Sequence, residues 1–192
     1  AALAAPAHWV VRMNYRNRCV SWLICVAVLS VHFLERGHGP WAWWLMVLQF
    51  LVYPHVVYLR ARRARDSLTA EIDNLLLDNF CFGLWAAALG FPLWIVFTLV
   101  ICGCINMTAF RALKGVLQAL AAAAAGATLM VALDGWRFTP ETSLRVSLMS
   151  MLCLSAYLVL FARDAHTRTV ALSATRARLR QSEAALQSQL QA

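Results

Sequence analysis

Long apolar segments alternate with short polar connections along most of the chain. Hydropathy delimits six such segments, at 19–34, 41–59, 72–89, 93–110, 113–133 and 144–161. Each is close to the ~20 residues that a helix needs to cross the hydrocarbon core of a bilayer. The pattern therefore predicts an all-α integral membrane protein built as a bundle of six transmembrane helices.

A different pattern follows in residues 163–192. This stretch has no Pro or Gly and is rich in Ala, Leu, Arg, Gln and Glu, which favour helices. Leucine recurs in it every seven residues, at Leu172, Leu179 and Leu186. Polar residues at the companion positions weaken this heptad, so a paired coiled coil and a solvated single helix remain as alternatives.

Positive charge is distributed unevenly among the connections. Of the 17 Lys and Arg residues, 14 lie before the first segment or after the second, fourth and sixth. The positive-inside rule places these connections and both termini in the cytoplasm. Most tryptophans lie near the opposite interface, where indoles anchor a bundle. We therefore expect a cytoplasmic segment 1–18, a transmembrane domain 19–162 and a cytoplasmic output helix 163–192.

The net charge of +8 and the pI of 9.8 would suggest nucleic-acid binding in a soluble protein. Here the arginines orient the spans beside anionic lipid, and no soluble basic helix carries interleaved aromatics. Membrane lipid, and not nucleic acid, is the expected partner. The six cysteines lie in or beside the apolar segments, so we expect neither a disulfide framework nor a metal site.

Several polar side chains lie at one depth inside the predicted membrane. At 1.5 Å per residue, four of them are roughly 6–8 Å from the cytoplasmic boundary, namely His55, Asp78, Asn106 and Gln118. Ionisable groups at this depth are costly and usually face the bundle interior or a cavity. The layer is a candidate ligand pocket, a protonation switch or a set of structural polar contacts between helices.

The third segment adds neighbours to this layer. Spacings of three, four and seven place on one helix face Glu71, Asn74, Asp78 and Trp85. In the second segment, Arg62 shares a face with His55, and Pro54 should kink the helix beside it. We predict that His55 and Asp78, on adjacent antiparallel spans, form a functional pair.

These residues resemble the signature of a known family. Pro54-His55, Arg62-Arg63-x-Arg65-Asp66, Glu71 and Asn74-Leu75-Leu76-Leu77-Asp78 resemble the MASE2 domain, a bacterial membrane-associated sensor. The resemblance covers about residues 16–162 and is strongest between Pro54 and Asp78. It brings Asp66 and Arg62 into the set of candidate signalling residues.

The resemblance implies a homodimeric six-helix anchor in the bacterial inner membrane that regulates an attached nucleotide cyclase. A class III adenylate cyclase is the first choice and a diguanylate cyclase the second, with a lipophilic small molecule as a candidate ligand. The chain contains no catalytic motif, so we expect it not to be an enzyme itself. Mg²⁺ and a nucleoside triphosphate are expected only in the cyclase domain, and no cofactor in this chain. A passive membrane anchor and a small transporter are the alternatives.

Overall fold

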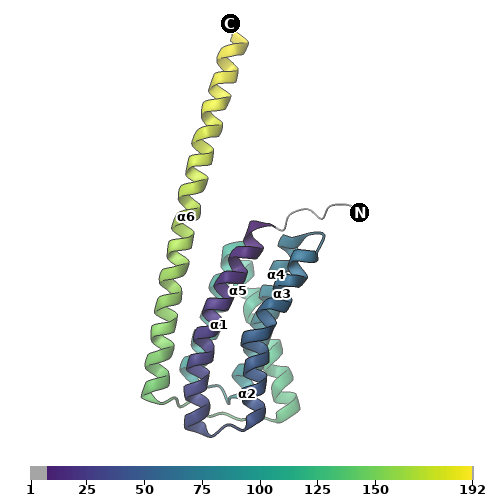
Figure 1. Cartoon of the computed structure of the whole chain (residues 1–192), viewed down its shortest axis with the longest axis vertical. Helices are drawn as coiled ribbons and strands as arrows, with labels where there is room; N and C mark the ends of the chain where they lie inside the picture. Colours follow the sequence, from purple (N-terminus) through teal and green to yellow (C-terminus); the bar gives the residue numbers. More distant parts are fainter. Residues whose placement is uncertain (1–7, 192) are drawn as a thin grey trace. The chain divides into compact units, whose positions relative to one another are not determined.

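The computed structural model describes residues 8–191, and these residues contain helices and no strand. This confirms the predicted all-helical class. In chain order the elements are α1 (Trp9–Arg36), α2 (Pro40–Val47), the π-helical turn η1 (Leu48–Val52), α3 (Tyr53–Arg63), α4 (Ser67–Ala88), α5 (Leu93–Asp134) and α6 (Leu144–Gln191). Figure 1 shows α1, α3 and α4 running side by side, with α2 at one end.

Four stretches of the described residues are long and apolar enough to cross a membrane: Trp9–Arg36, Pro40–Arg63, Leu93–Asp134 and Leu144–Thr167. The predicted span 72–89 lies in α4, which is not one of the four. Any 18-residue stretch of this helix contains Glu71, Asp73 and Asp78. The predicted fourth and fifth spans both fall within α5.

The long helix α5 reverses direction near its middle. Ala112 has φ 47° and ψ −136°, which is not helical. A Cβ added to Gly115 would collide with the carbonyl oxygen of Met107, although eight residues of a straight helix would separate the two by ~12 Å. The element therefore consists of two arms, 93–111 and 113–134.

Both arms of α5 pack closely on α4. In the second arm, a Cβ added to Gly126 would meet the carbonyl oxygen of Phe80. From the other side, a Cβ on Gly83 of α4 would meet the carbonyl oxygen of Ala123. Small residues allow helix backbones to approach in this way in an apolar environment. The α4–α5 contact is consequently the most extensive one between elements of the described bundle.

Three connections meet at one end of the bundle. The amide of Thr139 donates to the carbonyl of Gly90 over 2.8 Å, which ties the α5–α6 connection to the α4–α5 turn. The guanidinium of Arg36, at the end of α1, donates to the carbonyl of Glu141 over 2.6 Å. Gly37 ends α1 in the left-handed conformation, with φ 68°.

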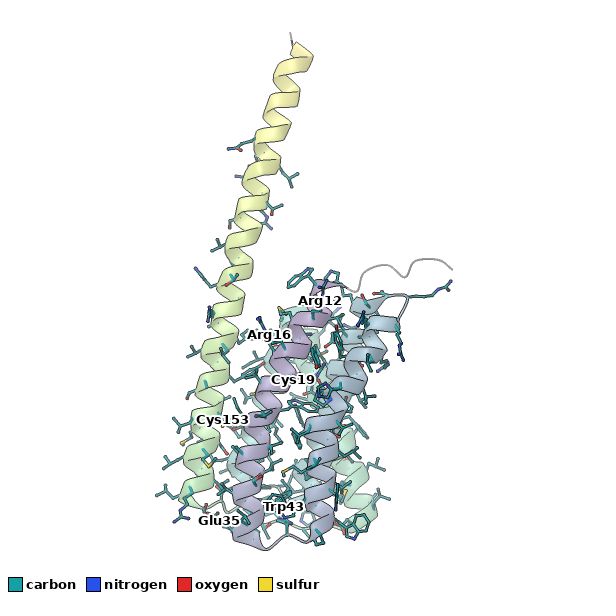
Figure 2. The ribbon with its side chains drawn as sticks, viewed as in Figure 1. Arg12, Arg16, Cys19, Glu35, Trp43 and Cys153 are labelled. Atoms are coloured by element: carbon teal, nitrogen blue, oxygen red, sulfur yellow. The ribbon has the colours of Figure 1, made fainter. Side chains whose placement is uncertain are left out.

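The other end of the bundle holds the starts of α1 and α4. The amide of His8 donates to the hydroxyl of Ser67 over 3.0 Å. Figure 2 shows Arg12 and Arg16 toward this end of α1 and Trp43 at the opposite end. Arg12 and Arg16 of α1 are thus separated from Trp43 of α2 along the length of the bundle.

An apolar core occupies the bundle between these ends. It joins side chains from α1, α2, η1, α4, the first arm of α5 and the start of α6: Trp22, Val28, Leu29, Phe33, Met46, Phe50, Phe82, Leu89, Ile95, Leu99 and Val146. Close packing at such a core resists changes in side-chain volume. It provides a firm layer next to the polar residues described below.

The chain divides into two compact units, one up to Leu154 and one from Ser155 on. Within α6, Val146 and Ser150 belong to the first unit and are buried there. The second unit contains the rest of α6. Leu179 of the predicted heptad is 57 % exposed in the single chain, while the side chains of the other two leucines lie outside the described set. Pairing into a coiled coil stays a prediction.

Candidate functional site

Helix α4 begins at a side-chain cap formed by Asp66. Its Oδ1 accepts from the amides of Leu68 at 3.1 Å and Thr69 at 3.0 Å, and its Oδ2 accepts from the Thr69 hydroxyl at 2.6 Å. The Thr69 hydroxyl contributes most to lowering the pKa of Asp66 below its usual value, followed by the Thr69 amide. An ionised Asp66 therefore fixes where α4 starts and stabilises its first turn.

From this start, α4 turns a polar face into the bundle. Glu71 and Asn74 are fully buried, and Asp78 is 5 % exposed. They share a face because their spacings of three and four follow the helical repeat, as predicted. Carboxylates in apolar surroundings need a charged partner or several hydrogen-bond donors.

The partner of both carboxylates is Arg18 of α1. Its Nε donates to Asp78 Oδ2 and its Nη2 to Glu71 Oε1, each over 2.9 Å. Arg18 is itself only 5 % exposed. A guanidinium presents five N–H donors in a rigid fork, so one arginine can bind two carboxylates that lie about two helical turns apart. Arg18, Glu71 and Asp78 form what we call the buried charge cluster, and it joins α1 to α4.

Asn74 connects this cluster to α3. Its Nδ2 donates to Glu71 Oε2 over 3.1 Å and to the carbonyl of Val57 over 2.9 Å. Its Oδ1 accepts from Arg60 Nη1 at 2.8 Å. Arg60 is half exposed and lies 4.0 Å from the equally exposed carboxylate of Asp73. A continuous set of polar contacts therefore leads from the protein surface to the buried charges.

The irregularity predicted at Pro54 takes the form of the π-helical turn η1. Pro54 has no N–H to donate to the carbonyl of Phe50. The amide of Tyr53 donates instead to the carbonyl of Leu48, five residues back. Such turns are frequent at functional sites. This one places Tyr53 beside Asp78.

Several buried polar atoms around Asp78 have no hydrogen-bond partner within the described part of the chain. They include Asp78 Oδ1, Arg18 Nη1 and the Tyr53 hydroxyl. An unsatisfied buried polar group costs ~1–3 kcal/mol, so such groups deserve a physical explanation. The cluster has unused hydrogen-bonding capacity on its Asp78 side.

The predicted pair of His55 and Asp78 is not formed. The His55 ring bonds to the hydroxyl of Tyr15 through Nδ1 at 2.8 Å, in an exposed position, while Asp78 is bound by Arg18. Helix geometry explains the difference. Two residues after Tyr53, His55 is rotated ~200° around the helix from the side chain that faces Asp78.

The other predicted residues lie apart from the charge cluster. Gln118 accepts from Arg111 Nη1 at 3.0 Å across the reversal of α5. Trp85 packs against the apolar core. Arg62 is exposed on α3, and Asn106 is half-buried in the first arm of α5. The structure therefore unites only the three α4 residues of the predicted polar set.

With this geometry in place, the chain can be compared with known proteins. Residues 13–101 match the family model of the MASE2 domain. The match confirms the resemblance over that range, which is slightly less than half of the chain. MASE2 is a membrane-associated sensor domain and not a catalytic one. No curated protein and no solved structure matched the chain.

The MASE2 match contains the whole buried charge cluster. It ends in the first arm of α5, so Asn106 and Gln118 lie outside it, although the resemblance was expected to extend to about residue 162. No three His, Cys, Asp or Glu side chains among the described residues are placed to bind one metal ion. The residues that match the family model also include the unpaired polar atoms around Asp78.

Arg18 was not among the predicted site residues, because its position before the first apolar segment is that of an arginine that orients the spans. A signal for its burial was present. Spacings of seven, four and seven place on one buried face of α1 the residues Val11, Arg18, Trp22 and Leu29. By contrast, Arg12 and Arg16 of the same helix are exposed. An arginine that shares a stripe with core residues in a MASE2 region is a candidate for pairing with its acidic residues.

Proposed function

We propose that this chain is the membrane sensor portion of a bacterial nucleotide cyclase. The observation that carries the proposal is the buried charge cluster inside the residues that match MASE2. Buried ion pairs often contribute less stability than well-packed apolar side chains of similar volume. A switch between two helix arrangements can use such a cluster, which favours a sensor over a passive anchor.

The cluster gives the domain a means of coupling its helices. Arg18 holds α1 to α4, and Asn74 holds α4 to the carbonyl of Val57 in α3. A change at one charge alters the packing of all three helices because they share these few polar contacts. In the proposed mechanism, this rearrangement reaches residues 163–192 and sets their geometry.

Regulation of a cyclase by such a domain requires two copies. We infer a parallel homodimer in which the output helices 163–192 pair through the heptad of Leu172, Leu179 and Leu186. Termini on one side of the membrane allow a two-fold axis along the membrane normal, which brings the two helices together. The spacing of these leucines supports this arrangement.

We also infer six membrane passes in the bacterial inner membrane, with both termini in the cytoplasm. In this topology, α4 is the third pass and the two arms of α5 are the fourth and fifth. The meeting of three connections at the end opposite Arg12 and Arg16 supports this count. The arginine bias then supports the orientation.

The attached enzyme is proposed to be a class III adenylate cyclase, with a diguanylate cyclase as the second candidate. A lipophilic ligand within the bundle is a further element of the proposal. An apolar cavity lined by α1, α5 and Ser150 of α6 has a volume of about 30 Å³. The helices must therefore move apart before a lipophilic ligand fits there. The charge cluster is therefore the better-supported sensing element.

The activity of the natural full-length protein tests this proposal. In membranes that contain it, we expect synthesis of cyclic AMP from ATP, or of cyclic di-GMP from GTP, with Mg²⁺ present. Both products are measured against membranes from the same host without the protein. The absence of both products would contradict the cyclase assignment. Their ratio would decide between the two enzyme classes.

A further inference from the structure

The buried charge cluster contains more negative than positive groups. Arg18 provides one positive charge, while Glu71 and Asp78 provide two carboxylates, and all three side chains are at most 7 % exposed. Arg60 reaches the cluster through Asn74, but it is half exposed and faces the carboxylate of Asp73. With both carboxylates ionised, the buried group would carry one uncompensated negative charge. The interior of a helix bundle strongly disfavours this state.

The hydrogen bonds distinguish the two carboxylates. Both oxygens of Glu71 accept from donors, Oε1 from Arg18 and Oε2 from Asn74. Only one oxygen of Asp78 does so, because Oδ2 accepts from Arg18 while Oδ1 has no partner among the described residues. A proton on Glu71 would displace an existing donor. A proton on Asp78 Oδ1 displaces nothing.

An acceptor for that proton lies close by. The hydroxyl of Tyr53, from the start of α3, is beside Asp78, although neither this hydroxyl nor Asp78 Oδ1 makes a hydrogen bond of good geometry within the described part of the chain. Other ionisable groups that interact with Asp78 are Arg18 of α1 and, on its own helix, Glu71 and Cys81. Of these side chains, only Arg18 brings positive charge to Asp78. It already divides its donors between two carboxylates.

We propose that Asp78 is a proton-binding site of this domain. In the resting state its carboxyl group carries a proton on Oδ1 and donates it to the Tyr53 hydroxyl, while Oδ2 keeps its bond to Arg18 Nε. Arg18 and the ionised Glu71 then balance each other, and the cluster is neutral. Loss of the proton as a free H⁺ leaves an excess negative charge beside Arg18 and favours a different arrangement of α1, α3 and α4. The ligand sensed at this position is therefore the proton.

Infrared difference spectroscopy of the protein in lipid bilayers tests this inference without reference to the attached enzyme. At neutral pH we expect a C=O stretching band of a protonated carboxylic acid. The band should shift when the side-chain carboxyl carbon of aspartate is labelled with ¹³C and stay in place when that of glutamate is labelled. It should weaken as the pH is raised.

Two matched variants complete the test. Asp78→Asn should remove the band, whereas Asp73→Asn, at the half-exposed carboxylate on the same helix, should retain it. Isotope labelling of the unmodified protein keeps the experiment decisive if Asp78→Asn fails to insert. The absence of an acid band at neutral pH would overturn the proposal, as would a shift with labelled glutamate. A water molecule bound at Asp78 without a proton would give no such band.

Discussion

Replacing Arg18 with alanine should lower the unfolding free energy of the bundle by ~3–5 kcal/mol, the range found when one partner of a buried ion pair is removed. The reason is that Arg18 is the shared donor of Glu71 and Asp78, so its loss leaves buried carboxylate oxygens without a cation. Denaturant unfolding in mixed micelles, followed by helical circular dichroism, measures this loss.

Arg16→Ala is the matched control for this prediction. Arg16 lies two residues away on the same helix but is exposed, so its replacement should change stability by less than ~0.5 kcal/mol. Adding Glu71→Gln and Asp78→Asn to Arg18→Ala should recover part of the lost stability, because the carboxylates no longer need a cation. Equal effects of Arg18→Ala and Arg16→Ala on the unfolding free energy would show that the buried charge cluster contributes nothing to stability.

The second large effect is expected at the contact between α4 and α5. A Cβ added to Gly83 would collide with the carbonyl oxygen of Ala123, which is backbone and cannot rotate away. We expect Gly83→Ala to destabilise the bundle by ~1–3 kcal/mol through overpacking, despite the higher helix propensity of alanine. The same unfolding experiment measures it.

Ala124→Leu provides the control for Gly83→Ala. Ala124 is next to Ala123 in the second arm of α5 but is exposed, so a larger apolar side chain there meets no neighbouring helix. Its stability should stay within ~0.5 kcal/mol of the unmodified protein. Native stability of Gly83→Ala would mean that α4 and the second arm of α5 are not held as closely as described.

Hydropathy was sufficient to place most helices. A segment in lipid must satisfy its backbone N–H and C=O groups with hydrogen bonds of its own, and a long apolar segment does so by forming a helix. The reversal at Ala112 falls in the predicted gap between 93–110 and 113–133. The start of α1 was missed. The helix begins at Trp9 rather than near residue 19, since its first turns also pack in the bundle and bury Val11.

The candidate site was predictable within one helix and not between helices. The spacing of Glu71, Asn74 and Asp78 was enough to predict that they share one face of α4. Arg18 is 53 and 60 residues from the two carboxylates that it binds, and no local pattern specifies such a pairing. The partner assigned to Asp78, His55, was wrong for a similar reason. The prediction used depth along the helix alone, whereas the rotation of the helix after Pro54 depends on the π-helical turn.

Glu71→Gln in the natural full-length protein tests the central claim most directly. The substitution keeps the side-chain shape and removes the charge that Arg18 and Asn74 both contact. A hydrogen bond to a charged group contributes ~1.5–3 kcal/mol, so loss of the charge can shift a two-state equilibrium about tenfold or more. Cyclic nucleotide synthesis per molecule in membranes is the measurement, with Asp73→Asn as the control.

The account predicts that Glu71→Gln changes this synthesis by about tenfold in either direction, while Asp73→Asn keeps the native rate. Protein abundance in the membrane and dimerisation are measured in the same samples. Native synthesis by Glu71→Gln, at native abundance and with native dimerisation, would contradict the account and leave the domain as a passive anchor.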